Sequence, residues 1–244
     1  MRTGVVLPTF RETPDDALAA AGAALAAGVD GVFCYDHLWP MGQPERPALA
    51  PFPILATLAA ASVPREPPVG GPYFGTLVAR VNLVPTDVLV DQFVALEHIA
   101  PGRIIAGIGT GDRLSREENI AYGLPTGTVT ERRDEMVAVA RRLRARDMTV
   151  WLAAGAGGRV DESAAAGSSA ILWGAEPELV KRRTQGPGRI EVIWAGPTPT
   201  GDGMVAATVG ALAGAGASWS VFAWPIDPRE LVDAARSQVT SEKD

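Results

Sequence analysis

The feature that most constrains the fold of this 244-residue chain is an alternation of two kinds of segment. Short apolar runs rich in Val, Ile and Phe are followed by longer, Ala-rich amphipathic runs. This alternation is typical of repeated βα units around a parallel sheet. We expect strands at residues 4–10, 31–37, 73–81, 103–108, 149–153, 169–173, 190–195 and 219–224. We expect helices at residues 13–27, 51–61, 86–99, 130–144, 160–166, 176–184 and 204–213, a last helix from Asp227, and a loop before residue 130.

The number of these units predicts a closed (β/α)8 TIM barrel of the α/β class. An open doubly wound sheet more often stops at about five or six strands. No linker-like or low-complexity segment divides the sequence, so we expect one domain over residues 1–244. In such a barrel, binding and reacting groups belong at the carboxyl ends of the strands. Polar or glycine-rich residues directly after each strand are therefore the candidates for a site.

Composition excludes several classes of protein. Hydrophobic residues make up 47% of the chain and charged residues 20%, which is an ordinary globular balance. The net charge of −6, without a Lys/Arg cluster, disfavours nucleic acid and anionic membranes as partners. The apolar runs are short and broken by Gly, Pro or charge, so neither a signal peptide nor a membrane span is expected. We expect a cytoplasmic protein that acts on a small-molecule substrate, with a homodimer left open.

The residues that most often bind metals are scarce. Cys34 is the single cysteine, and His37 and His98 are the two histidines. They lie apart in the sequence, so zinc and iron sites are not expected. His98 comes late in an expected helix, where a structural role suits it.

The end of the second expected strand carries an Asp-His pair, Asp36 and His37. An imidazole beside a carboxylate can transfer a proton near neutral pH. The alternative is a structural histidine on a loop. His37 is therefore a candidate catalytic residue, and Asp36 a candidate contact of the ligand.

The fourth expected strand ends in a glycine-rich turn, Gly109-Thr110-Gly111. Such glycines let a backbone pass close to a ligand, although a tight barrel turn needs small residues as well. Asp112 follows directly and is a candidate general acid or an anchor for a helix dipole. Its neighbours Glu117 and Glu118 are expected to be solvated.

A second glycine-rich turn follows the fifth expected strand and opens a helix. Unpaired N–H groups at a helix start form an anion site, and an arginine beside them adds a charge-assisted contact. The alternative is a flexible turn with a surface arginine. The candidate phosphate-binding residues are Gly155, Ala156, Gly157, Gly158 and Arg159.

Several segments, in this order along nearly the whole chain, resemble the luciferase-like family of flavin- and coenzyme F-420-dependent oxidoreductases. They are Gly28-Val29-Asp30-Gly31-Val32, Asp36-His37-Leu38, Gly75-Thr76-Leu77-Val78, Leu96-Glu97, Pro101-Gly102-Arg103, Gly107-Ile108-Gly109-Thr110-Gly111, the helix with Arg132, Arg133 and Glu135, Val150-Trp151-Leu152, and Gly214-Ala215-Gly216-Ala217-Ser218-Trp219. The resemblance implies a flavin-type ring at the mouth of a barrel.

The resemblance also implies roles for single residues. His37 occupies the position of a histidine that takes part in proton transfer in deazaflavin-dependent relatives. Asp112 stands where a glutamate is common and is one methylene shorter, and Ser115 replaces an asparagine that contacts the cofactor. Thr76 and Leu77 match a strand segment that contacts the ring, often through a non-proline cis peptide bond.

This chain departs from the family in one respect, because it lacks the usual insertion before the fifth strand. Residues 144–148 join the preceding helix directly to that strand. The resemblance then implies an open or partner-covered pocket, or a barrel that no longer catalyses. We expect coenzyme F-420-dependent hydride transfer to or from a small organic substrate. The alternatives are a monooxygenase that uses flavin mononucleotide (FMN) and a non-catalytic flavin- or deazaflavin-binding barrel.

Overall fold

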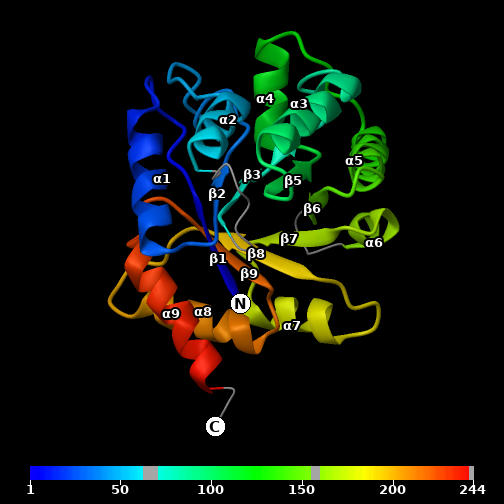
Figure 1. The fold of residues 1–244 in the computed structure, drawn as a ribbon. Helices are drawn as coiled ribbons and strands as arrows, with labels where there is room; N and C mark the ends of the chain where they lie inside the picture. Colours follow the sequence, from blue (N-terminus) through cyan, green and yellow to red (C-terminus); the bar gives the residue numbers. More distant parts are fainter. Residues whose placement is uncertain (63–70, 155–159, 242–244) are drawn as a thin grey trace.

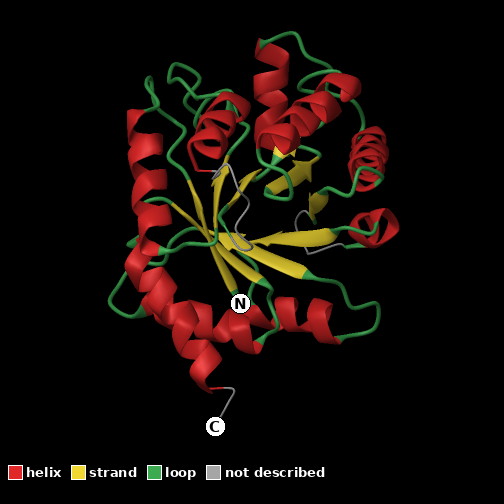
Figure 2. Cartoon of the chain, viewed as in Figure 1, coloured by secondary structure: helices red, strands yellow, loops and turns green. Residues whose placement is uncertain are grey.

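The computed structural model describes residues 1–62, 71–154 and 160–241, and within them the strands form a closed parallel barrel (Figures 1 and 2). The strand order is β3-β2-β1-β9-β8-β7-β6-β5-β4, and pairing of β3 with β5 closes the ring. The prediction of a (β/α)8 barrel is therefore confirmed. The strands are β1 Arg2–Val6, β2 Gly31–Cys34, β3 Tyr73–Thr76, β4 Ala79–Arg80, β5 Ile104–Gly109, β6 Thr149–Ala153, β7 Ser169–Trp173, β8 Val192–Gly196 and β9 Trp219–Ala223.

The third predicted strand is divided in two. β3 and β4 are separated at Leu77 and Val78, and the peptide bond between these two residues is cis. Both short strands pair in parallel with β5, so together they occupy one place in the ring. The barrel thus has eight places for its strands.

Helices surround the barrel on its outside (Figure 2). No helix in the described parts of the chain is long and apolar enough to cross a membrane. The helices are α1 Asp15–Ala27, α2 Pro51–Ser62, α3 Thr86–Ile99, α4 Arg113–Ala121, α5 Val129–Arg144, α6 Asp161–Ala166, α7 Pro177–Gln185, α8 Met204–Gly214 and α9 Pro228–Ser241.

Helix α4 lies where the sequence predicted only a loop. Its residues are mostly polar, so they lack the run of apolar positions by which the other helices were recognised. The helix begins at a capping box, in which the Asp112 carboxylate accepts from the Ser115 backbone N–H and the Ser115 side chain accepts from the Asp112 N–H. This extra helix stands directly after β5, at the carboxyl end of the barrel.

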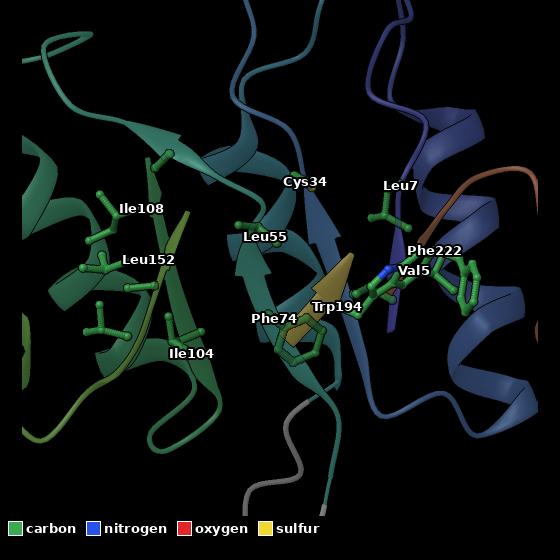
Figure 3. Close-up of a cluster of buried hydrophobic side chains, with 14 of the residues drawn as sticks. Val5, Leu7, Cys34, Leu55, Phe74, Ile104, Ile108, Leu152, Trp194 and Phe222 are labelled. Carbon is green, nitrogen blue, oxygen red and sulfur yellow. The ribbon is translucent and has the colours of Figure 1, made fainter. Parts of the chain in front are cut away.

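Alternate residues of each strand divide between two apolar clusters. Val5 and Leu7 belong to the larger cluster, which also contains residues of the surrounding helices, such as Leu55 (Figure 3). Val6 belongs to the smaller cluster, whose buried members all come from strands or the Leu77 break. Because successive side chains of a strand point to opposite faces, the smaller cluster fills the barrel interior.

Three aromatic rings pack against one another in that interior. Phe33 stacks on Trp151 with ring centroids 5.2 Å apart, and Trp219 meets the same two rings edge-on at 6.0 Å and 5.1 Å. A glycine on β1 makes room for them, since a Cβ added at Gly4 would lie 2.8 Å from the Phe33 ring. Side chains therefore fill the bore between the strands, and the mouth is where a barrel of this kind carries its site.

Two glycines give opposite predictions for the same substitution. A Cβ at Gly107 in β5 would lie 2.0 Å from the Thr76 carbonyl oxygen, which is backbone and cannot move aside. Gly107→Ala should lower the free energy of unfolding by about 1–3 kcal/mol, as overpacking does. Gly22 in α1 has no atom within 4 Å of an added Cβ. Gly22→Ala should raise the free energy of unfolding by about 0.5–1 kcal/mol. Urea unfolding measures both, and an unchanged Gly107→Ala variant would contradict the packing described.

Candidate active site at the barrel mouth

The first two residues after β2, Tyr35 and Asp36, point in different directions, one toward the mouth and one into the wall of the barrel. Phe33 lies in the interior cluster and Cys34 in the outer one, so Tyr35 continues the inward-facing row. Asp36 is buried, and its carboxylate accepts a hydrogen bond from the Arg80 backbone N–H at 3.0 Å. Burial raises the pKa of Asp36, although the N–H group and the charge of Arg80 oppose this shift. Asp36 thus fastens the loop after β2 to β4.

Arg80 is a buried cation at the centre of the mouth's polar contacts, with only 4% of its side chain exposed. Its Nε donates to the Asp36 carbonyl oxygen at 3.0 Å, and one terminal nitrogen donates to Glu118 Oε2 at 2.8 Å. The other terminal nitrogen donates to the Ser115 carbonyl at 3.3 Å and to Asn119 Oδ1 at 3.4 Å. One guanidinium therefore joins β4, the loop after β2 and helix α4.

Glu118 is a second buried carboxylate of the site, with 1% of its side chain exposed. Its Oε1 lies 2.6 Å from His37 Nδ1, and its Oε2 accepts from the Leu38 N–H at 2.8 Å. Burial by itself raises the pKa of Glu118. The hydrogen bonds from His37 and Leu38, with the charges of His37 and Arg80, outweigh burial and hold this pKa below its ordinary value. The side chain is therefore ionised at neutral pH.

The expectation that Glu118 is solvated is wrong, whereas Glu117 beside it is exposed. The cause is the undetected helix α4, which turns Ser115, Glu118 and Asn119 toward the barrel. These residues are spaced three and four apart, which places them on one helical face. That spacing was the available signal, but polar residues on such a face are usually solvated.

Three aromatic side chains, Phe10, Tyr35 and Trp173, meet at the mouth, and we call them the aromatic floor. Phe10 stacks on Tyr35 with centroids 5.7 Å apart, and Tyr35 meets Trp173 edge-on at 6.1 Å. Tyr35 follows β2 and Trp173 ends β7, four places away in the strand order, so the rings meet across the mouth. Trp173 is 52% exposed, which is unusual for a large aromatic residue of a barrel strand. Sequence reasoning did not identify this floor.

The aromatic floor also reaches the candidate histidine. The rings of Phe10 and His37 have centroids 6.4 Å apart and are tilted by 56°. Burial raises the pKa of Tyr35 to about 12, so its phenol keeps its proton near neutral pH. The mouth therefore combines aromatic side chains with an imidazole and a phenol that keeps its proton.

Asp112 and the turn before it lie beside a different hollow. Ser115 N–H and Ser115 Oγ donate to Asp112 Oδ1 at 2.8 Å and 3.0 Å, as expected of a helix N-cap. A small pocket there is lined by Thr110, Gly111, Asp112, Ser115 and Arg80 among others, and His37 is not among its lining residues. The structure thus places His37 against Glu118. Asp112 lies elsewhere, at the start of α4. A role of Asp112 as an acid stays a prediction.

The candidates on the third strand lie deeper in the wall. The Thr76 hydroxyl donates to the Gly107 carbonyl at 2.6 Å, and the side chain is fully buried. Leu77 is buried in the interior cluster. A Cβ at Gly109 would lie 2.5 Å from Val78 Cγ2, so this glycine lets β5 approach the break between β3 and β4.

Two further predictions from the sequence concern a phosphate site and metal binding. The candidate phosphate site, residues 155–159, lies outside the described residues. Over residues 1–62, 71–154 and 160–241, no group of three His, Cys, Asp or Glu side chains is placed to hold a metal ion.

The capping geometry predicts how α4 responds to changes at Asp112. Asp112→Ala removes the acceptor of the Ser115 N–H and should lower the free energy of unfolding by about 0.5–2 kcal/mol. Asp112→Asn keeps an oxygen acceptor and should cost much less, because asparagine is an equally good N-cap. Chemical denaturation of the two variants compares them directly. Equal losses in both would show that the carboxylate charge, rather than the cap, stabilises this region.

Comparisons with known proteins bear on what such a site does. No protein-family model matches the chain. It is 32% identical over 130 residues to an F420-dependent glucose-6-phosphate dehydrogenase of Beutenbergia cavernae, covering 51% of this chain and 34% of the relative. It is 29% identical over 135 residues to an F420-dependent hydroxymycolic acid dehydrogenase of Mycobacterium tuberculosis, covering 55% of this chain and 35% of the relative. The matches thus span about a third of each relative's length.

Solved structures share the fold at low identity. An F420-dependent secondary alcohol dehydrogenase in complex with an F420-acetone adduct has a TM-score of 0.72 and 15% identity, over 96% of this chain and 99% of that one. The oxygenating constituent of 3,6-diketocamphane monooxygenase of Pseudomonas putida, in complex with FMN, has a TM-score of 0.57 and 12% identity, over 81% and 67% of the two chains. Sequence and fold together support the resemblance of this chain to the luciferase-like oxidoreductases that use a flavin or coenzyme F-420.

Proposed function

We propose that this chain is an oxidoreductase that binds coenzyme F-420 at the barrel mouth and transfers a hydride to or from a small organic substrate. The observation that carries the proposal is His37, which lies beside the aromatic floor with one ring nitrogen held by the buried carboxylate of Glu118. The similarity to two F420-dependent dehydrogenases supports the choice of cofactor. We also infer one domain over residues 1–244 and a cytoplasmic location, with a homodimer left open.

The described residues fit the ring of such a cofactor. A flat tricyclic system packs well against aromatic side chains, which Trp173, 52% exposed, supplies together with Tyr35 and Phe10 beside it. Gly109 and Gly111 instead allow close packing within the protein, because an added Cβ at these positions would contact Val78 and Ser115 respectively. For the phosphate of the cofactor we propose residues 155–159, with Arg159 as the charged contact. When bound, the deazaflavin supplies the acceptor or donor of the hydride.

The side chains of this protein would perform the remaining steps. The aromatic floor orients the reactants and keeps water from one side of them. His37 accepts the proton of an alcohol oxygen as the carbon is oxidised, or donates a proton to a carbonyl oxygen as the carbon is reduced. Tyr35 keeps its proton and can donate a hydrogen bond to the same oxygen. Glu118 and Arg80 are buried, and in this proposal they act through His37.

The second candidate function is an FMN-dependent monooxygenase, which the likeness to an FMN-bound monooxygenase supports. Oxygen chemistry on a reduced flavin must be shielded from water. The connection from α5 to β6, residues 145–148, lies at the amino ends of the strands and does not bear on the mouth. Among the described residues of the mouth, however, Trp173 is 52% exposed, so this part of the mouth is open to water. This openness favours hydride transfer over monooxygenation. A third candidate, a cofactor-binding barrel without turnover, does not account for an imidazole held by a buried carboxylate.

Cofactor affinity tests the proposal first. Titration of the purified protein with coenzyme F-420 and with FMN, followed by quenching of their fluorescence, should show tighter binding of coenzyme F-420. The physical reason is the open mouth, which accommodates a long polar tail. Tighter binding of FMN, or FMN retained through purification, would favour the monooxygenase. Binding of neither would defeat both enzymatic proposals.

Substitution of the two histidines tests the proposed proton transfer. His37→Ala should lower kcat by about 10²–10⁴-fold, the usual contribution of a general acid or base. His98→Ala is the matched control, because His98 is exposed near the end of α3 and should leave kcat unchanged. Steady-state kinetics with coenzyme F-420 measures both variants. Unchanged turnover in His37→Ala would remove this residue from the mechanism.

A further inference from the structure

We infer that Glu118 is a positioning residue that fixes the protonation of the His37 ring, with the proton on Nδ1 and with Nε2 as the nitrogen that exchanges a proton at the mouth. The inference about the ring depends only on the contacts of Glu118. Its consequence for catalysis rests on the proposed function.

The contacts of the two Glu118 oxygens require His37 Nδ1 to be the donor of the hydrogen bond between these residues. Oε2 already accepts from two groups that can only donate, the Leu38 N–H and the Arg80 guanidinium, both at 2.8 Å. Oε1 lies 2.6 Å from His37 Nδ1. An ionised carboxylate only accepts, so the hydrogen of this short contact must come from Nδ1. In its neutral form the ring therefore carries its single proton on Nδ1.

The charge on Glu118 is secured by its surroundings. Despite its burial, its pKa lies below the ordinary value because His37 and the Leu38 N–H donate to it and Arg80 is close. Arg80 cannot leave easily, because Asp36, Ser115 and Asn119 accept hydrogen bonds from its other donors. A buried carboxylate that lost this partner would be strongly destabilised. The acceptor that faces Nδ1 is thus ionised at neutral pH and held in place by its hydrogen bonds.

The opposite nitrogen of the ring is the one available to a ligand. Within the described residues His37 forms no hydrogen bond through Nε2, and 22% of its side chain is exposed. Its ring adjoins Phe10 of the aromatic floor. A proton taken up at Nε2 creates an imidazolium whose charge Glu118 stabilises at 2.6 Å. This is the arrangement in which a base is oriented by a third group that does not itself take the proton.

The tautomer can be read directly by NMR on the unmodified protein. With only two histidines, ¹⁵N-histidine labelling gives two ring systems, and His98→Gln assigns them. Spectra are recorded without cofactor between pH 5 and pH 9. In the neutral form of the His37 ring, they should show the proton on Nδ1 and an unprotonated Nε2. A neutral ring with its proton on Nε2 would overturn the inference. Because this readout needs no turnover, it is independent of whether coenzyme F-420 is the cofactor.

Kinetics of paired variants then tests the catalytic consequence. Glu118→Gln should lower kcat by at least about 10-fold, as loss of an orienting partner does. It should also change the pH–rate profile, because the anionic partner of His37 is gone. Affinity for coenzyme F-420 should stay unchanged. Glu117→Gln, one residue away and exposed, is the control and should match the parent protein.

The outcomes separate the two levels of the inference. A Glu118→Gln variant with the parent pH–rate profile and the parent tautomer would overturn the positioning role. If this variant does not fold, the tautomer in the parent protein still decides. A proton on Nδ1 in a protein that neither binds nor turns over coenzyme F-420 would leave the role of Glu118 intact and contradict the proposed function.

Discussion

The arrangement of the barrel mouth depends on the buried ion pair between Arg80 and Glu118. A buried charge is tolerated only when it is paired and fully hydrogen-bonded. Here the Arg80 guanidinium supplies a positive charge and a donor, and the Glu118 carboxylate supplies a negative charge and an acceptor. Arg80 comes from the second half of the divided third strand, and Glu118 from a helix that follows the next strand. The pair therefore fixes α4 against the barrel. Through Glu118 it also fixes the orientation of His37.

The solid interior of the barrel determines where a ligand can bind. Aromatic rings from β2, β6 and β9 fill the bore, while the residues that follow β1 and β2 and those that end β7 turn aromatic side chains toward its mouth. Along β7, for example, four buried residues are followed by the exposed Trp173 at the carboxyl end. A planar ligand on this floor would lie against the same layer that carries His37. The fold thus brings an aromatic surface and an imidazole together at one end of the barrel.

The sequence predicted the barrel and most of its elements because strand and helix have different apolar periods. The bounds of α3, β6 and β7 agree with the predicted ranges at both ends. His37 was identified because it follows a strand, which in a barrel is enough to place it at the mouth. Those inferences need only local pattern and the general rule for where barrels carry their sites.

The remainder could not be predicted because it depends on contacts between distant segments. Helix α4 is polar, so it is visible only through the hydrogen bonds of its buried face to Arg80, some 35 to 39 positions away. Glu118 looks like a surface residue until that cation is placed beside it. The floor of Phe10, Tyr35 and Trp173 joins residues that only closure of the ring brings together. Pairing across a barrel leaves no periodic signal in the sequence.

The measurement that tests the central claim most directly is a crystal structure of the protein with coenzyme F-420 bound. The claim is that His37, held at Nδ1 by Glu118, presents Nε2 to a deazaflavin at the barrel mouth. The predicted result is a ring seated beside the aromatic floor, with His37 Nδ1 still on Glu118 and Nε2 facing the reacting side of the ring. A ring bound away from His37, or a histidine turned so that Nε2 contacts Glu118, would contradict it.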